Sequence, residues 1–290
     1  MPEIRIVTDS GAHFSNPYFV SQNQITVIPN KIDIGGKIYR EGIDINATDA
    51  MQLIARQSIA PTVTAPSVAE YVEMFTRVSH HCEAIVSIHT SREISLSWQN
   101  ARAAAQQLSG HCEIAVVDSQ SICAGQGMLV RVAVQACEQE GTVDDVVRKV
   151  RGAVERVYSM YYVENVDYLL QNKIMSASHT ILGKLLGIKP FLTVEEGRLV
   201  AVEKVRTRTQ AVERLCEFAV EFAEIEDAVI LQHKTHTTDQ ARMLHDRLSQ
   251  EFPDRAFPTT VYGTFLATLI GADATGIVIL EEEMELEDDF

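Results

Sequence analysis

The sequence has no apolar run long enough to span a bilayer, and its first residues lack the basic and apolar regions of a signal peptide. Cysteine is also scarce, with five among 290 residues and no CxxC pair. An odd number at irregular spacing predicts reduced thiols and gives no support to a zinc site. These absences predict a cytosolic protein that does not insert into membranes and holds neither a metal nor a cofactor.

Positive charge is in short supply as well. The 25 Lys and Arg residues face 40 Asp and Glu residues, which gives a formal net charge of -15 and a pI near 5.0. Such a surface repels polyanions and argues against nucleic acid as a partner. Part of the negative charge lies in the acidic tail, residues 281–290, which is expected to be a solubilising terminus. The one basic segment, residues 203–208 with Arg206, is expected on composition to be a solvated face.

Complete nucleotide-binding and hydrolase motifs are missing. The chain contains no GxxxxGK[ST] and no GxSxG sequence. Gly125-Gln126-Gly127 lacks the third glycine of a phosphate-binding loop and does not directly follow an expected strand. These glycines are therefore expected to relieve crowding at the start of a helix rather than to bind a nucleotide.

Apolar residues are plentiful, at 46% of a chain long enough for two packed domains. The first half alternates apolar strand-like runs with helical periodicity, which is typical of a parallel sheet between helices. The second half mixes strand pairs with helices and predicts a mixed sheet. The predicted fold class is two-domain α/β, with a three-layer parallel-sheet domain over 1–160 and a mixed-sheet domain over 161–290.

Individual elements follow from periodicity, caps and turns. Strands are expected at 4–7, 24–29, 31–39, 84–89, 114–118, 191–194, 199–204, 228–232, 258–262 and 277–280. Helices are expected at 48–59, 95–108, 125–139, 142–157, 177–188, 209–225 and 239–252. Gly35-Gly36 predicts a hairpin, and Ser67 with Glu70 predicts a capping box.

Two of the predicted strands end in an Asp-Ser pair. Asp9 and Ser10 follow the first strand; Asp118 ends the run at 114–118, and Ser119 comes directly after it. Because ligands bind at the carboxyl edge of open α/β sheets, Asp9, Ser10 and Ser119 are candidate binding residues.

The segment His89 to Ser95 is richer in polar groups. It follows an apolar strand and precedes a helix, so its hydroxyls, Arg92 and free helix N–H groups suit a carboxylate or phosphate. Ser91 and Ser95 would serve equally well as helix caps. His89 also stands two residues before Ser91, so a Ser–His dyad of a hydrolase or transferase is an alternative.

A third polar segment, Pro61 to Ser67, contributes the hydroxyls of Thr62 and Thr64 but no strong general base. Together these segments indicate a site that holds a polar head group rather than one that breaks bonds.

In order along the chain, these segments resemble those of the DegV family, bacterial fatty-acid-binding proteins. The resemblance rests on T-D-S at Thr8 to Ser10, on P-T at Pro61 and Thr62, on the S-S helix start at Ser91, on V-D-S ending at Ser119, and on E-K-V-R-T-R from Glu203 to Arg208. It spans nearly the whole chain.

The resemblance implies two α/β domains with a long-chain fatty acid between them, its carboxylate held by Thr62 and Ser91. It also implies a protein without catalytic activity, of a kind that in some members presents the acid to a separate fatty acid kinase. Asp9, Ser10, Thr64, Ser95, Ser119 and Arg206 complete the predicted ligand-binding set.

The chain departs from the family pattern at several positions. Val63, Leu96 and Leu269 stand where the family has threonine, glycine and histidine. Arg92 replaces a serine, and it either clamps an anionic head group or pairs with a surface acid. Two alternatives to a lipid carrier remain at this point. One is a serine hydrolase or transferase using Ser91 and His89, and the other is a regulatory interaction protein with a degenerate pocket.

Overall fold

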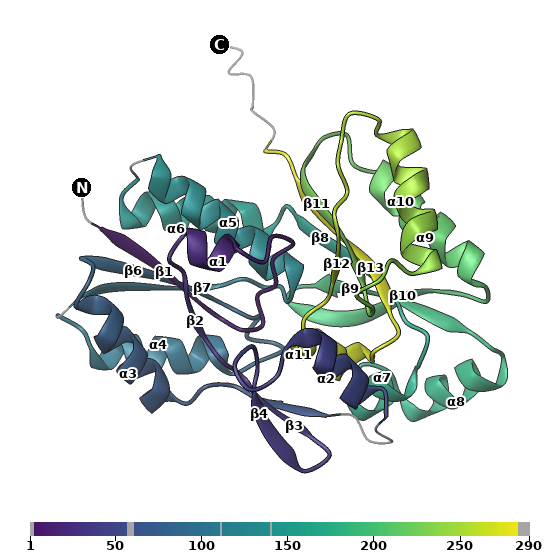
Figure 1. Cartoon of the computed structure of the whole chain (residues 1–290), viewed down its shortest axis with the longest axis horizontal. Helices are drawn as coiled ribbons and strands as arrows, with labels where there is room; N and C mark the ends of the chain where they lie inside the picture. Colours follow the sequence, from purple (N-terminus) through teal and green to yellow (C-terminus); the bar gives the residue numbers. More distant parts are fainter. Residues whose placement is uncertain (1–2, 57–60, 111, 140, 284–290) are drawn as a thin grey trace.

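The computed structural model describes residues 3–56, 61–110, 112–139 and 141–283. Four strands form a parallel sheet in the order β2-β1-β6-β7 (Figure 1). These strands are β1 (Ile4–Asp9), β2 (Thr26–Ile28), β6 (Ala84–His89) and β7 (Glu113–Asp118). Every residue of β6 is buried, as expected for a central parallel strand with helices on both faces. The predicted parallel sheet is confirmed.

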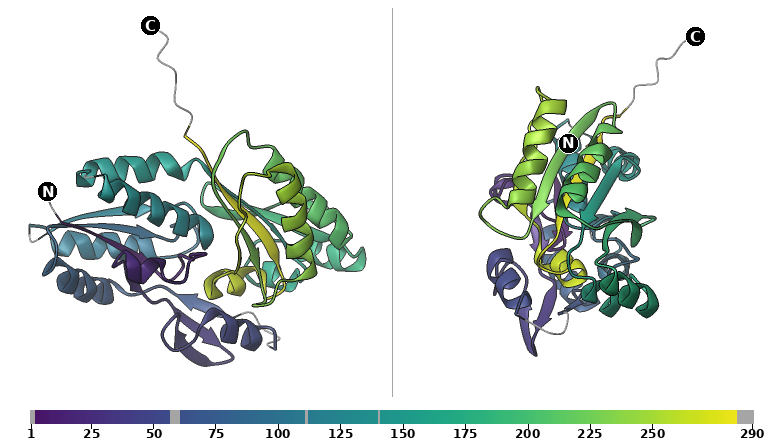
Figure 2. Two further views of the ribbon diagram at one scale, coloured as in Figure 1. Left: turned by 45° about the horizontal axis from the view of Figure 1, so that its top comes forward. Right: turned by 90° about the vertical axis from the view of Figure 1, so that its right-hand side faces the viewer.

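Two pairs of helices complete three layers (Figure 2). The helices α3 (Val68–Ser79) and α4 (Ser97–Gln107) pack on one face of the sheet, and α5 (Ala124–Glu138) and α6 (Val143–Val154) pack on the other. The short helix α1 (Phe19–Gln22) connects β1 to β2.

The capping box predicted at Ser67 is confirmed. The Ser67 side chain accepts a hydrogen bond from the Glu70 N–H at 3.3 Å, and the Glu70 carboxylate accepts from the Ser67 N–H at 2.9 Å. The box satisfies two backbone donors that the first turn of α3 leaves without helical partners.

A second sheet has six strands in the order β10-β9-β8-β13-β11-β12. Only β11 and β12 pair in parallel, so the predicted mixed sheet is confirmed. The strands are β8 (Val157–Tyr162), β9 (Lys189–Glu195), β10 (Arg198–Val205), β11 (Ile225–Gln232), β12 (Thr259–Val261) and β13 (Thr275–Glu281).

The two faces of this sheet pack against different parts of the molecule. Along β13, Ile277 and Ile279 join a core with α9 (Arg208–Val220) and α10 (Asp239–Glu251), whereas Val278 and Leu280 face the core shared with α5. The helix α5 therefore lies between both sheets, which explains why it carries apolar residues on nearly every side.

A small antiparallel sheet has the order β4-β3-β5, from β3 (Lys31–Ile34), β4 (Lys37–Arg40) and β5 (Thr62–Thr64). Gly35 and Gly36 join β3 to β4 with φ of 63° and 84°, the two positive values that a tight hairpin turn requires. The predicted hairpin is confirmed. The remaining helices are α2 (Ala47–Ile54), α7 (Asp167–Gln171), α8 (Ala177–Leu185) and α11 (Thr264–Ile270).

The helix predicted over 142–157 is correct except at its carboxyl end. The helix α6 stops at Val154, and Val157 begins β8, which sequence analysis missed. Valine and tyrosine favour strands, and β8 pairs with β9 and β13, far along the chain. The predicted helix at 48–59 ends at Ile54, and residues 57–60 lie outside the described part, as does most of the acidic tail.

Candidate functional site

The carboxyl ends of β1 and β6 meet where the strand order of the parallel sheet reverses, the usual ligand crevice of such folds. Here that position is filled by a closed hydrogen-bond network around Asp9. Its carboxylate accepts bonds from the Gly11 and Thr90 N–H groups at 2.8 and 3.0 Å, and from the Thr90 hydroxyl at 2.8 Å. The His89 Nδ1 lies 3.0 Å from the same carboxylate.

Asp9, His89 and Thr90 are completely buried. Burial alone would raise the pKa of Asp9, but the hydrogen bond and charge of His89 and the bonds from Thr90 outweigh it and lower that pKa. Gln126 closes the network, since its side-chain NH₂ donates to the Thr8 hydroxyl and its side-chain oxygen lies 2.9 Å from the Thr90 hydroxyl. Asp9 is thus placed to organise the strand ends, and its acceptors are already occupied.

The structure does not bring His89 and Ser91 together as a catalytic dyad. The His89 Nε2 lies 2.6 Å from the Ser87 hydroxyl, and its Nδ1 faces Asp9 and Tyr71. The Ser91 hydroxyl instead accepts from the Glu93 N–H at 3.2 Å. The strand β6 ends at His89, so Ser91 no longer follows the strand alternation from which the dyad was inferred.

Ser91 lies at the junction of the two sheets. It is fully buried, and its N–H donates to the Ser121 carbonyl at 2.9 Å. The turn between β9 and β10 approaches so closely that a Cβ on Gly197 would lie 2.3 Å from the Ser91 hydroxyl oxygen. Gly197 also has φ of 80°, so both crowding and backbone conformation demand glycine here.

Arg92 points away from this junction. Its Nε lies 3.5 Å from Asp118 and 3.7 Å from Glu93, its guanidinium lies over the Trp98 ring, and its side chain is 54% exposed. Of the two roles expected for Arg92, a clamp on an anionic head group or a pair with a surface acid, these contacts match the second.

Ser95 and Ser119 have local partners. The Ser95 hydroxyl bonds to the hydroxyl and N–H of Ser97 at the start of α4. The Ser119 hydroxyl donates to the Ser121 carbonyl and accepts from the Ser121 N–H, which shapes the turn after β7. Both residues flank Ser91, because the Ser95 N–H donates to the Ser91 carbonyl and the Ser119 N–H to the His89 carbonyl.

Thr62 and Thr64 lie on β5 with exposed side chains, while Val63 between them packs against the core. The following segment is tied to the start of α4, since the Asn100 side chain donates to the Pro66 carbonyl at 2.8 Å. The two segments that the sequence nominated for a head group are therefore neighbours.

Ser10 belongs to a separate cluster with Glu41. The Ser10 hydroxyl donates to the Glu41 carboxylate at 2.6 Å and accepts from the Asn30 N–H. The other Glu41 oxygen accepts from the Phe265 N–H at 2.9 Å, which ties β1 and the end of β4 to α11. Burial raises the pKa of Glu41 to about 7, with a smaller contribution from the Asp9 charge, despite the hydrogen bonds that favour ionisation.

Replacing Glu41 with glutamine should make the protein relatively more stable as the pH rises. The folded-state pKa lies above the ordinary value of 4.5, so ionisation costs folded-state stability from that value upward, and the full cost is reached above about pH 7. Between pH 6 and pH 8 the stability of Glu41→Gln relative to the parent should improve by about 1 kcal/mol. Urea unfolding of both proteins at the two pH values measures this difference, and an unchanged difference contradicts it.

Arg206 lies apart from the other candidates. It is exposed, follows the far end of β10 and precedes α9, whereas the opposite end of β10 meets Ser91 through the Gly197 turn. The strand has eight residues, so its two ends are seven residue steps apart, about 23 Å.

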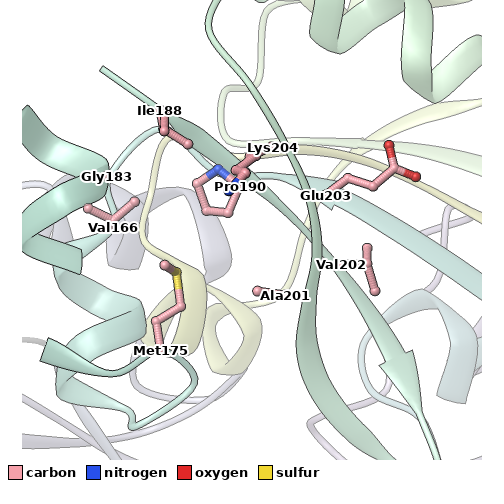
Figure 3. A pocket seen from close by; sticks show the side chains of 9 residues that line it. All are labelled: Val166, Met175, Gly183, Ile188, Pro190, Ala201, Val202, Glu203 and Lys204. Carbon is pink, nitrogen blue, oxygen red and sulfur yellow. The ribbon is translucent and has the colours of Figure 1, made fainter. Parts of the chain in front are cut away.

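A cavity of ≈ 260 Å³ opens beside β10 (Figure 3). In Figure 3, Met175 points toward Pro190, whereas the Glu203 carboxylate points away. The lining is mainly apolar and comes from the α7–α8 region, β9 and β10: Val166, Met175, Gly183, Ile188, Pro190, Ala201, Val202, Glu203 and Lys204.

One face of the β9–β10 hairpin runs from this cavity to Ser91. Val194 pairs with Leu199, and Leu192 pairs with Ala201, so these side chains share a face. Leu192 and Leu199 belong to the large core, and Ala201 lines the cavity. A row of apolar side chains thus lies between the cavity and a buried hydroxyl about 13 Å away along the strand.

Within the described residues, no group of three or more His, Cys, Asp or Glu side chains is arranged to hold a metal ion. No helix in that part of the chain is long and apolar enough to cross a membrane.

Sequence analysis missed two residues that shape the site. Nothing in the sequence around Gly197 indicates that its turn reaches Ser91. Glu41 lies in an acidic stretch, and only the fold shows that α11 covers it. The prediction that Gly125 and Gly127 relieve crowding is confirmed, since Cβ atoms there would lie 2.2 Å from the Ser121 hydroxyl and 2.1 Å from the His13 carbonyl.

Comparisons with known proteins match this architecture. The family model described as "Uncharacterised protein, DegV family" matches residues 3–282. A DegV domain-containing protein of Listeria monocytogenes is 27% identical over 279 residues, which cover 95% of this chain and 97% of that protein.

Solved structures are similar over nearly the full length. A fatty acid binding DegV family protein from Streptococcus agalactiae superposes with a TM-score of 0.86 at 26% identity, covering 98% of this chain and 100% of that one. The fatty acid kinase (Fak) B3 protein of Streptococcus pneumoniae, loaded with linoleic acid, shares the fold with a TM-score of 0.83 at 18% identity, covering 97% and 100%.

Proposed function

Because this chain belongs to the DegV family, we propose that it binds a long-chain fatty acid and performs no reaction on it. The acyl chain occupies the cavity beside β10, and the carboxyl group reaches Ser91 and the neighbouring Thr62 segment. The Streptococcus agalactiae structure, 26% identical, is of a fatty acid binding protein and supports this assignment.

The observation that carries the proposal is the apolar face of the β9–β10 hairpin. It joins a cavity with an apolar lining to a buried hydroxyl at the junction of the two sheets. Ligand sites commonly combine such a lining with a few polar groups that fix orientation. Ser91 accepts from Glu93, which leaves its own hydroxyl hydrogen available to a carboxylate.

Ser91→Ala should weaken fatty acid binding about 10- to 100-fold, because one hydrogen bond to a charged group contributes about 1.5–3 kcal/mol. Titration with a fluorescent fatty acid measures the change. Thr62→Val should act in the same direction. If both variants bind the fatty acid as tightly as the parent, its head group does not bind at this end of the hairpin.

Arg92→Ala is the matched control for that experiment. Arg92 adjoins Ser91 in sequence but is committed to Asp118 and Glu93 at the surface. Exposed ion pairs contribute about 0–1 kcal/mol, so its loss should change the affinity less than about fivefold. A loss as large as that of Ser91→Ala would instead support the head-group clamp.

We extend the proposal to the cytosol as location and to a separate fatty acid kinase as partner, as the family resemblance implies. The kinase would phosphorylate the carboxyl group of the bound acid. A pull-down with the kinase from the same cell, with and without fatty acid, tests the partnership, and no ligand-dependent association would contradict it.

A further inference from the structure

Two of the five cysteines meet at the edge of the parallel sheet that faces away from Ser91. Cys82 lies between α3 and β6, and Cys112 directly precedes β7. Their thiols lie near enough for each to influence the pKa of the other. The Cys82 thiol also donates to the Val78 carbonyl, and the Cys112 thiol to the Glu83 carbonyl, each at 3.4 Å.

The strand register explains why these residues are close. Ala84 of β6 pairs with Glu113 of β7, and adjacent strands lie about 4.8 Å apart. Cys112 stands one position before this pair and Cys82 two positions before it, and the Cys112 thiol reaches the carbonyl of Glu83, the residue next to Cys82. A disulfide bridges Cα atoms about 4.4–6.8 Å apart, a range that includes the spacing of adjacent strands. Both cysteines are partly exposed, so a small reagent has access to them.

We propose that Cys82 and Cys112 form a reversible redox site that closes to a disulfide by exchange with a small disulfide such as oxidised glutathione. One cysteine thiolate attacks a glutathione sulfur, the S–S bond breaks, and one glutathione leaves as a thiol. The second cysteine then attacks the protein-bound sulfur and releases the second glutathione. Two protein thiols are oxidised, one disulfide is reduced, and the two thiol protons pass to the leaving groups.

The exchange is slow at neutral pH and leaves the ligand site untouched. Burial raises the pKa of Cys82 to about 11, with a further contribution from Cys112, and burial also raises the pKa of Cys112, so little thiolate is present. The disulfide would link β6 to β7 at their amino ends. Ser91 follows the carboxyl end of β6, about 20 Å from the disulfide. Oxidation should therefore stabilise the sheet without changing ligand affinity.

The test is incubation of the intact folded protein with oxidised glutathione, followed by peptide mapping without reductant. We expect free thiols to fall from five to three, since the protein has five cysteines, and a peptide linking Cys82 to Cys112 to appear. The melting temperature should rise by about 5 °C and return after dithiothreitol.

Two variants decide the assignment. Cys137→Ser should still form the link, because Cys137 lies on α5, away from the pair. Cys112→Ser should abolish both the link and the rise in melting temperature. Separate glutathione adducts on Cys82 and Cys112, or a link that forms only in denaturant, would overturn the proposal.

Discussion

Replacing Asp9 with alanine should lower the free energy of unfolding by about 3–5 kcal/mol, enough to unfold many domains of ordinary stability. The Asp9 carboxylate is fully buried and accepts bonds from Gly11, Thr90 and His89. Its removal leaves the buried donors without an acceptor, which costs far more than the net value of the bonds themselves. The strand ends beside the ligand site lose the group that positions them.

Urea denaturation followed by circular dichroism measures the loss. Asp9→Asn should lower the free energy of unfolding by less than Asp9→Ala, because the amide oxygen still accepts hydrogen bonds. It should still be destabilising, because the amide NH₂ faces a backbone N–H donor. Asp239→Ala is the matched control, since the Asp239 side chain is 91% exposed, and it should stay within about 0.5 kcal/mol of the parent. A loss below about 1 kcal/mol for Asp9→Ala would show that the network contributes little.

Replacing Ala201 with tryptophan should abolish high-affinity fatty acid binding. Ala201 lines the cavity of ≈ 260 Å³ beside β10, and an indole there would displace about six methylene groups of the ligand. Because each buried methylene contributes about 0.8 kcal/mol, the loss is about 5 kcal/mol, and the Kd should rise more than a thousandfold.

The control for this variant is Ala69→Trp, which adds the same bulk on α3, at an exposed position that does not line this cavity. It should bind fatty acid like the parent. Ala201→Ser tests whether position 201 tolerates change at all, and it should also bind normally. If Ala201→Trp folds and retains the parental affinity, the acyl chain does not occupy this cavity.

The sequence predicted the architecture well where local pattern decides it. Apolar runs ending in Asp-Ser, the glycine pair of the β3–β4 hairpin and the box at Ser67 each carry their own physical signal. The strand β8 carries only the strand propensity of its valine and tyrosines, with no turn or cap to mark where it begins, and its place is set by pairing with β9 and β13, which lie far along the chain.

The candidate site was predictable only in part for the same reason. Hydroxyls at strand ends indicate a sheet edge, and the structure does gather Ser91, Ser95 and Ser119 there. Which of those hydroxyls is covered depends on the Gly197 turn, and the partners of Arg92 depend on how β7 places Asp118. Such contacts between distant segments cannot be derived from residue spacing.

Native mass spectrometry of the purified protein, followed by organic extraction and lipid analysis, tests the central claim most directly. A buried long acyl chain should survive purification, because burial of its methylenes dominates the affinity. The predicted result is a bound mass equal to one long-chain fatty acid, present in the parent and in Ala69→Trp but absent from Ala201→Trp. A parent protein that releases no lipid, and whose melting temperature does not rise with added fatty acid, would contradict the account.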